Sequence, residues 1–398
     1  MCQACDFDKE LQPILSLDSH PLVHNLMESQ AAAVLAQRYP LDLVRCPACE
    51  LVQLKYVPSE ENVFPRSYPY RSGVTGELVV SLRDLVKDVR SVVQPGVAVD
   101  IGANDGTLLD AFKDSYNGSQ WRTIAIEPSD AIEDCALGHE RIQGYFSEKM
   151  AREVFHKESV DVVTATNVFA HTPNPRDFLK AIKYMLKPNG VFASESHYLV
   201  DLIGSLQYDT IYHEHRRYYH LGSLLSLFHS EGFSVFQVKR TCTHGGSLRV
   251  LAYPTSCRIR GQSGVLSTLA GERDVSYATT LIAFAKEVER QRNRLIEIIN
   301  QAKTRGRRVV GVGAPARCST VLNYADLTHK NVEYIAEQSN SPKIGLFLPG
   351  SGIPVVDEKI LLEEPENTVI LNFAWHLRGL PSRLQERGVK GKIVPVIR

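Results

Sequence analysis

Apolar and polar positions follow two different rhythms along the chain, and their order predicts the fold class. An amphipathic stretch at 77–89 has apolar residues at helical spacing, and short apolar runs bounded by turn residues follow it. These runs lie at 97–101, 123–127, 160–166 and 191–196. Short strands separated by helical segments predict a parallel sheet covered on both faces, which is a doubly wound α/β domain.

The same alternation returns in the last third of the chain. It opens with an apolar segment at 246–254 and continues through a long charged helix near 276–304. Further apolar runs lie at 308–317, 332–337 and 368–374. This pattern predicts a second, Rossmann-like sheet. The N-terminal segment has few apolar residues and is distinct from both sheet-forming segments. We therefore expect three domains, at 1–72, 73–238 and 239–398.

Four of the eight cysteines form two C-x-x-C pairs in the N-terminal segment. Cys2 and Cys5 make the first pair, and Cys46 and Cys49 make the second. Each pair can present two thiolates, which together complete tetrahedral zinc at about 2.3 Å. Four protein ligands leave no open position for water, so the expected metal is structural. The alternatives are four reduced cysteines, a redox pair, and a zinc ribbon that binds nucleic acid.

Charge and hydropathy narrow the choice of partners. The 398 residues include 45 basic and 45 acidic side chains, so no global field attracts nucleic acid or anionic membrane. No apolar run reaches the roughly 18 residues of a membrane span, and the N-terminus MCQACDFDKE lacks the regions of a signal peptide. We therefore expect a cytoplasmic monomer or weak dimer that acts on small molecules.

An apolar strand leads directly into the turn of 97-VAVDIGANDGTLLDAF-112, which carries Asp100, Gly102, Asn104 and Gly106. Glycines let the backbone approach a ligand closely, and a helix N-terminus attracts negative charge. Glu127 ends the next strand, where an acid can accept both hydroxyls of a ribose. That geometry suits a dinucleotide or S-adenosylmethionine. A dinucleotide fold requires G-x-G-x-x-G, whereas this turn resembles the D-x-G-x-x-x-G signature of class I methyltransferases, so S-adenosylmethionine is predicted, with Asp100 near its amino group.

Two further segments carry candidate catalytic side chains. The first, 162-VVTATNVFAHTPNP-175, ends the strand that lines the methyl-transfer face in such folds, and it carries Asn167 and His171. The second, 208-YDTIYHEHRRYYHL-221, is predicted at the C-terminal edge of the same sheet. A metal site through His213 and His215 is one alternative, and a polar rim is another. A histidine flanked by a glutamate and tyrosines fits a general base better.

These motifs resemble a known family, the sugar C-methyltransferases that act on nucleotide-linked 4-keto-deoxysugars. The resemblance covers nearly the whole chain and rests on VDIGANDG, NVFAHTPNP and DTIYHEHRRYY together with five more motifs. The five are 43-LVRCPACELVQL-54, 67-SYPYRSG-73, 244-HGGSLRV-250, 311-GVGAPAR-317 and 345-GLFLPGSGIPV-355. The family has an N-terminal zinc domain, a middle S-adenosylmethionine domain and a C-terminal Rossmann-like domain, with the sugar nucleotide between the last two.

The resemblance implies methylation at C3 of a nucleotide-linked sugar, here a dTDP sugar, in deoxysugar biosynthesis. A base removes the C3 proton that the neighbouring ketone acidifies, and the resulting enolate takes the methyl group without a catalytic metal. By position in the motif, His215 is the expected base, and Tyr212 and Glu214 position the substrate. His213 is expected to face away and to be structural.

The resemblance also implies roles for residues outside that motif. His171, with Tyr68 or Tyr70, is expected to shape the enolate side. Tyr70 and Asn167 are also expected to bind the cofactor.

The C-terminal segment departs from the family pattern at two points. Glu337-Gln338 stands where an aspartate followed by proline and lysine is usual, and His376 follows Trp375 in place of asparagine. The specificity of the nucleotide pocket therefore stays open, with Lys343 and the loop around Gly313 as candidate contacts against a purely structural turn.

Two competing functions use other features of the sequence. An NAD(P)-dependent nucleotide-sugar oxidoreductase or epimerase would use GVGAPAR as its dinucleotide loop, where alanine would replace the third glycine. A non-enzymatic protein would use the zinc ribbon to recruit a nucleic acid or a protein partner, with strongly salt-dependent binding to polynucleotides.

Overall fold

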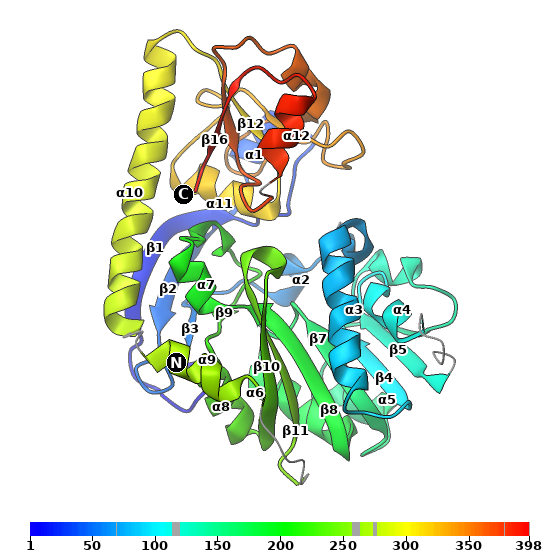
Figure 1. The fold of residues 1–398 in the computed structure, drawn as a ribbon. Coiled ribbons are helices and arrows are strands. Elements are labelled where there is room, and N and C mark those ends of the chain that lie inside the picture. The colour runs from blue at the N-terminus through cyan, green and yellow to red at the C-terminus, as the bar shows by residue number, and fades with distance from the viewer. Residues whose placement is uncertain (69, 114–119, 257–262, 274–276, 378, 398) are drawn as a thin grey trace.

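The computed structural model describes residues 1–68, 70–113, 120–256, 263–273, 277–377 and 379–397. Within these residues the strands form three sheets (Figure 1). The smallest is antiparallel and has the order β1-β2-β3-β9. Its strands are β1 (Gln12–Pro21), β2 (Arg38–Arg45), β3 (Val52–Leu54) and β9 (Arg217–Tyr218). The last of these strands comes from the histidine-rich segment, so that segment completes the N-terminal sheet.

The middle sheet has the order β10-β11-β8-β7-β4-β5-β6, and all its neighbours are parallel except those of β11. Its strands are β4 (Val97–Ile101), β5 (Arg122–Glu127), β6 (Glu140–Gln143), β7 (Val160–Thr166), β8 (Leu186–His197), β10 (Phe233–Thr241) and β11 (Ser247–Pro254). The four strands expected in this region are all present, and the doubly wound order of the sheet confirms the predicted class I methyltransferase fold.

Helices cover both faces of the middle sheet. One face packs against α3 (Gly76–Arg90) and α4 (Thr107–Lys113). Helix α3 buries Leu78, Leu82, Leu85, Val86 and Val89, which recur at helical spacing on one side. The other face carries α5 (Glu148–Val154), α6 (Pro175–Met185) and α8 (Leu221–Ser230). The short helices are α1 (Gln30–Val34), α2 (Glu60–Val63), α7 (Leu199–Gly204) and α9 (Val265–Arg273).

The C-terminal sheet is parallel and has the order β14-β13-β12-β15-β16. Its strands are β12 (Val309–Val312), β13 (Ile335–Glu337), β14 (Val355–Asp357), β15 (Val369–Asn372) and β16 (Lys392–Pro395). The first strand of this unit lies at the centre, which confirms the Rossmann-like prediction. Helices α11 (Ala316–Tyr324) and α12 (Leu380–Glu386) pack on opposite faces of the sheet.

One predicted strand belongs to a different sheet from the one expected. The segment at 246–254 was expected to open the C-terminal domain, but β11 pairs with β8 and β10 in the middle sheet. The expected boundary at residue 239 therefore falls inside β10. An apolar run predicts a strand but does not specify its hydrogen-bond partner, and β11 is the one antiparallel member of its sheet.

The long helix α10 (Tyr277–Thr304) packs against both the N-terminal sheet and the C-terminal sheet. It runs beside β1 and reaches the C-terminal sheet (Figure 1). Its apolar side chains, among them Leu281, Val288 and Leu295, share one core with the N-terminal and C-terminal sheets. The N-terminal segment also bonds directly to the C-terminal part, because Met27 and Phe347 form a β-bridge. The first and last thirds of the chain are therefore packed together.

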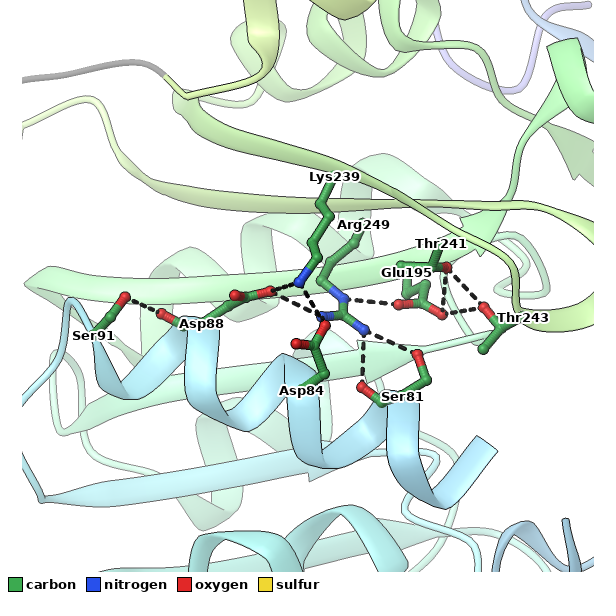
Figure 2. A network of polar contacts seen from close by, with 9 residues as sticks. All are labelled: Ser81, Asp84, Asp88, Ser91, Glu195, Lys239, Thr241, Thr243 and Arg249. Atoms are coloured by element: carbon green, nitrogen blue, oxygen red, sulfur yellow. Dashed lines mark hydrogen bonds and ion pairs between the residues drawn. The ribbon is translucent and has the colours of Figure 1, made fainter. Parts of the chain in front are cut away.

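A buried ion-pair network fixes α3 on the middle sheet (Figure 2). The guanidinium of Arg249 on β11 is 1% exposed and donates to Glu195 at 2.8 Å and to Asp84 and Asp88 at 2.9 Å each. It also donates to the main-chain and side-chain oxygens of Ser81. Glu195, at the end of β8, is itself 3% exposed. Arg249 and Glu195 are both shielded from water, so each charge is stabilised mainly by the opposite charge of the other.

Arg249→Met is expected to lower the free energy of unfolding by about 3–5 kcal/mol, because it leaves Glu195 as an unpaired buried charge. Urea denaturation followed by tryptophan fluorescence measures the change. Lys239→Met is the matched control: its ammonium pairs with the same aspartates but is 41% exposed, so its removal is expected to cost less than about 1 kcal/mol. Equal losses in the two variants would contradict the role of Arg249.

Candidate active site

The polar side chains of interest gather where the strands of the middle sheet end. His171 follows β7, His197 is the last residue of β8, and the segment at 209–217 crosses beside them. The ring centroid of His215 lies 5.0 Å from that of His171 and 4.5 Å from that of His197. Tyr212 is also in contact, with ring centroids 4.2 Å apart. The structure therefore brings together His215, Tyr212 and His171, as predicted from the sequence.

The hydrogen bonds of His215 determine which of its nitrogens carries the proton. Its Nδ1 lies 2.6 Å from the main-chain oxygen of Thr210. A carbonyl oxygen can only accept, so Nδ1 is the N–H donor, and Nε2 keeps its lone pair. Burial lowers the pKa of His215 well below its usual value, and nearby His171 and Arg317 lower it further. The imidazole is therefore neutral at neutral pH, and its Nε2 lone pair is not already protonated.

Glu214 connects this segment to the N-terminal part of the chain. Its two carboxylate oxygens lie 3.0 Å from His24 Nδ1 and 2.9 Å from the hydroxyl of Tyr68. Its main-chain oxygen accepts a hydrogen bond from Nδ1 of His171 at 2.5 Å. The glutamate expected to position substrate thus positions Tyr68 and His171 within the protein.

Both tyrosines at the site are neutral hydrogen-bond donors. Burial raises the pKa of Tyr68 well above its usual value, and the charge of Glu214 adds to the effect. The pKa of Tyr212 is raised by the same two causes. A neutral phenol can donate to an oxygen on which negative charge develops. His171 is also neutral, since burial lowers its pKa.

His213 points away from this group, as expected. It is 1% exposed, its Nε2 lies 3.2 Å from the main-chain oxygen of Pro40, and its ring contacts Tyr39 on β2. Residues 213–214 form a turn, so His213 and His215 do not share a strand face. The paired-histidine metal site considered from the sequence is not formed. Among the described residues, the group with metal-ligand geometry is the cysteine cluster.

The glycine turn after β4 holds the residues predicted for the cofactor. Gly102 has a φ of +69°, and a Cβ there would come within 2.3 Å of Val168. The main-chain N–H of Asn104 donates to Glu127 at 3.0 Å, and the side chain of Asn104 bonds to the main chain of Ser72 and Tyr70. The turn is thus closed against both the next strand and the tyrosine-rich segment.

Other residues predicted for the cofactor surround this turn. Asp100 is 1% exposed and accepts a hydrogen bond from Thr164 at 2.6 Å, and burial raises its pKa to about 7. Gly106 has a φ of +81°, which allows the turn into α4. Asn167 has a φ of +55°, and its buried Oδ1 has no hydrogen-bond partner among the described residues. An unpaired acceptor at the edge of the turn fits a site that a polar ligand completes.

The four cysteines of the N-terminal segment meet at one point. Their sulfur atoms all lie within 4.8 Å of one another, with Cys2 and Cys49 3.6 Å apart and Cys5 and Cys46 3.7 Å apart. Sulfurs at the corners of a zinc tetrahedron with Zn–S bonds of about 2.3 Å are separated by about 3.8 Å. The geometry therefore fits a closed tetrahedral zinc site.

Sequence reasoning missed several residues that the structure places at the site. They are His24, His197, His244, Asp209, Arg317 and Trp375. Asp209 is buried and accepts a hydrogen bond from the indole of Trp375 at 2.7 Å. Arg317 lies 3.9 Å from Asp209 and donates to the main-chain oxygen of His244 at 3.1 Å. Arg317 in α11 and Trp375 after β15 belong to the C-terminal domain, so the site lies between two domains.

Comparisons with known proteins agree with this architecture. Three family models match in chain order: a zinc binding domain at 2–64, a methyltransferase domain at 81–238 and a C-methyltransferase C-terminal domain at 242–393. The C-methyltransferase NovU of Streptomyces niveus is 31% identical over 362 residues, which are 89% of this chain and 84% of NovU. The chain belongs to the C-methyltransferases.

Two solved structures resemble part of this C-methyltransferase. A SAM dependent methyltransferase from Archaeoglobus fulgidus is 14% identical, with a TM-score of 0.36 over 44% of this chain and 93% of the other. One from Aquifex aeolicus is 16% identical, with a TM-score of 0.34 over 44% of this chain and 90% of the other. Since both scores are below 0.5, the fold assignment rests on strand order and on the family models.

The C-methyltransferase is an S-adenosylmethionine-dependent enzyme with structural zinc. When bound, S-adenosylmethionine supplies an electrophilic methyl group. On the protein side, Asp100, Asn104 and Glu127 would hold its polar groups around the glycine turn, and the four cysteines would hold zinc. Among the described residues, no helix is long and apolar enough to cross a membrane.

Affinity for S-adenosylhomocysteine is expected to rise between pH 6 and pH 8. The pKa of Asp100 is raised to about 7, so the carboxyl is protonated at the lower pH and ionised at the higher one. The ionised form attracts an ammonium group, so affinity follows its fraction. Isothermal titration calorimetry across this range tests the slope. Asp100→Asn should bind more weakly, without that slope, and a slope that persists in the variant would contradict the assignment.

Cys46→Ser is expected to lose zinc and to destabilise the N-terminal segment, because Cys46 is fully buried in a core shared with the middle sheet. Elemental analysis of the purified protein gives the zinc content, and limited proteolysis shows where the chain opens. Cys135→Ser is the control, since that thiol lies in a different core cluster. Equal zinc content in the wild type and Cys46→Ser would exclude the site.

Proposed function

We propose that this enzyme methylates C3 of a nucleotide-linked 4-keto-deoxysugar, with a dTDP sugar as the expected substrate, in deoxysugar biosynthesis. The observation that carries the proposal is the state of His215: its Nδ1–H is spent on Thr210, and its Nε2 lone pair remains in a buried, neutral site. A histidine nitrogen with a free lone pair can accept a proton from carbon next to a ketone.

The charges of the site support an enolate. When His215 takes the C3 proton, the electron pair of the C–H bond moves into the C3–C4 bond and negative charge develops on the C4 oxygen. Tyr212 keeps its proton at neutral pH and can donate to that oxygen, whereas Tyr68 donates its one hydroxyl proton to Glu214. Carbon C3 would then form a bond to the methyl group as the methyl–sulfur bond of the donor breaks, with that electron pair left on sulfur and the C4 ketone restored. The proton on His215 leaves to water after turnover.

The remaining residues would orient these groups. Glu214 would hold Tyr68, and the main chain of Glu214 would fix the ring of His171. Arg317 and Trp375 bring the C-terminal sheet to the same group, which supports a substrate that spans two domains. On this proposal the N-terminal domain binds zinc, the middle domain binds the methyl donor, and the C-terminal domain binds the nucleotide. We also propose a cytoplasmic enzyme that acts as a monomer or weak dimer.

His215→Asn is expected to lower methyl transfer by about 10²–10⁴-fold, because an amide cannot take the C3 proton. Solvent deuterium exchange at C3 of the ketosugar should fall with it, while affinity for S-adenosylhomocysteine stays unchanged. Mass spectrometry of dTDP-, CDP- and GDP-linked 4-keto-6-deoxysugars after reaction identifies the substrate and measures both effects.

His213→Asn provides the matched control for this measurement. It changes the neighbouring imidazole of the same motif, which bonds to Pro40 and not to the site. Its methyl transfer and exchange should stay within a few-fold of wild type. Full activity in His215→Asn would refute the role of His215 as the base. If none of the sugars gains the mass of a methylene group, the proposed substrate class is wrong.

A further inference from the structure

His215 has a single nitrogen that can both receive a proton and release it. The residue is 5% exposed, and its Nδ1–H is bonded to the main-chain oxygen of Thr210 at 2.6 Å. A proton taken from the sugar would therefore lie on Nε2 and would have to leave from Nε2. Substrate bound against that nitrogen would keep water away from it. Release of the proton during the reaction thus requires a second acceptor beside the ring.

The imidazole of His197 lies beside that of His215, with ring centroids 4.5 Å apart and an angle of 56° between the rings. His197 is the last residue of β8 and pairs with Ser247 on β11, so the sheet fixes its main chain. Its Nε2 is buried and has no hydrogen-bond partner among the described residues. A buried polar atom without a partner is costly, and one beside a base indicates that its lone pair is used in the reaction.

His244 extends this row of imidazoles beyond His197, with ring centroids 5.7 Å apart. It lies in the turn Thr243–Gly245 between β10 and β11 and has a φ of +56°. A residue with a Cβ is disfavoured in this left-handed region, so the backbone at His244 is strained. Strain of this kind persists where the surrounding structure imposes it, and it is concentrated at functional sites.

Three parts of the chain hold the turn in this conformation. The hydroxyl of Thr243 donates to Glu195 at 2.7 Å (Figure 2). The amide of Gln207 donates to a main-chain oxygen of the same turn at 2.6 Å. Arg317 donates to the main-chain oxygen of His244 at 3.1 Å. The position of the His244 ring is therefore fixed from the middle sheet, from the histidine-rich segment and from the C-terminal domain.

Exposure to solvent increases along the row. His215 is buried, His197 and His244 are partly exposed, and Cys242 at the start of the turn is exposed. Burial lowers the pKa of His197 well below its usual value, and the neighbouring histidines lower it further. Burial and the charge of Arg317 lower the pKa of His244 to about 4. Neither ring retains a proton at neutral pH, so a proton that reaches them passes on to water.

His171 is the other imidazole beside His215, with ring centroids 5.0 Å apart. Its Nδ1 donates to the main-chain oxygen of Glu214, and its ring packs against Phe64 at 5.4 Å. A phenyl ring cannot carry a proton. Within the described part of the chain, the row of imidazoles therefore continues from His197 and not from His171.

We propose that His197 relays the C3 proton from His215 to solvent by way of the turn that carries His244. This inference rests on the proposed function, in which His215 takes that proton. Protonated His215 gives the proton on its Nε2 to the Nε2 lone pair of His197, directly or through one water, and His197 releases the proton on its Nδ1 toward the turn. His215 is then neutral with its lone pair restored, and proton exchange with water returns His197 to its first tautomer.

Two rates measured on the full-length protein separate the relay from the chemistry. The first is deuterium exchange at C3 of the dTDP-linked 4-keto-6-deoxysugar with S-adenosylhomocysteine bound. Exchange requires the proton on His215 to reach solvent before it returns to carbon. The second is methyl transfer in a single turnover, which requires only that the proton be removed. Since both rates come from the same folded protein, their ratio does not depend on how much of a variant is folded.

His197→Ala is expected to lower the ratio of exchange to methyl transfer by about tenfold or more, because the proton on His215 then returns to carbon. Imidazole added to the buffer should restore exchange in this variant, since it can take the place of the missing ring and carry the proton. His213→Asn is the matched control, because it removes a neighbouring imidazole that bonds to Pro40. Its ratio should equal that of the wild type, with or without imidazole.

A wild-type ratio in His197→Ala, or a lowered ratio that imidazole does not restore, would overturn the relay. Equal losses in the two rates would also overturn it, since they indicate a purely structural role. Failure of the proposed function gives a different result. If the wild type exchanges no deuterium at C3, or if His215→Asn keeps both rates, the base itself is wrong. If His215→Asn loses both rates while His197→Ala keeps the wild-type ratio, only the relay fails.

Discussion

The buried polar segment at 209–217 is the feature on which the rest of the structure depends. Asp209, Thr210, His213 and Arg217 are each 1% exposed or less, although all carry polar side chains. Such groups are costly to bury unless they are hydrogen-bonded. Each part of the chain supplies partners, so the segment can stay buried only when all three parts are folded around it.

The partners come from distant regions. Arg217 donates to Gln3 at 2.6 Å and to the main chain of Thr172, His213 bonds to Pro40, and Trp375 donates to Asp209. The segment therefore joins the zinc domain, the middle sheet and the C-terminal sheet. Removing one domain would leave some of these buried groups without their hydrogen-bond partners. The N-terminal domain with the cysteine cluster is therefore joined to the histidine-rich segment through Gln3 and Pro40.

Much of the fold could be predicted from the sequence, because the strands are short apolar runs bounded by turn residues such as Gly96, Gly102, Ser159 and Asn167. The runs at 97–101 and 160–166 are observed as β4 and β7 with the same bounds. The site was harder to predict, because the side chains that form hydrogen bonds with each other there are far apart in the sequence. Glu214 is 190 positions from His24, and Asp209 is 166 positions from Trp375. Local patterns identify a reactive motif, but they carry no information on which distant side chain completes it.

The two larger sheets also explain why the reactive motif lies where it does. His171 and His197 stand at the C-terminal ends of β7 and β8, and both contact His215. Arg317 and Trp375 follow β12 and β15 of the other sheet, and both contact Asp209. Ligands of doubly wound sheets bind at the carboxyl ends of the strands. The buried segment thus meets the binding edges of both sheets, so a donor held by one sheet and an acceptor held by the other would come together beside His215.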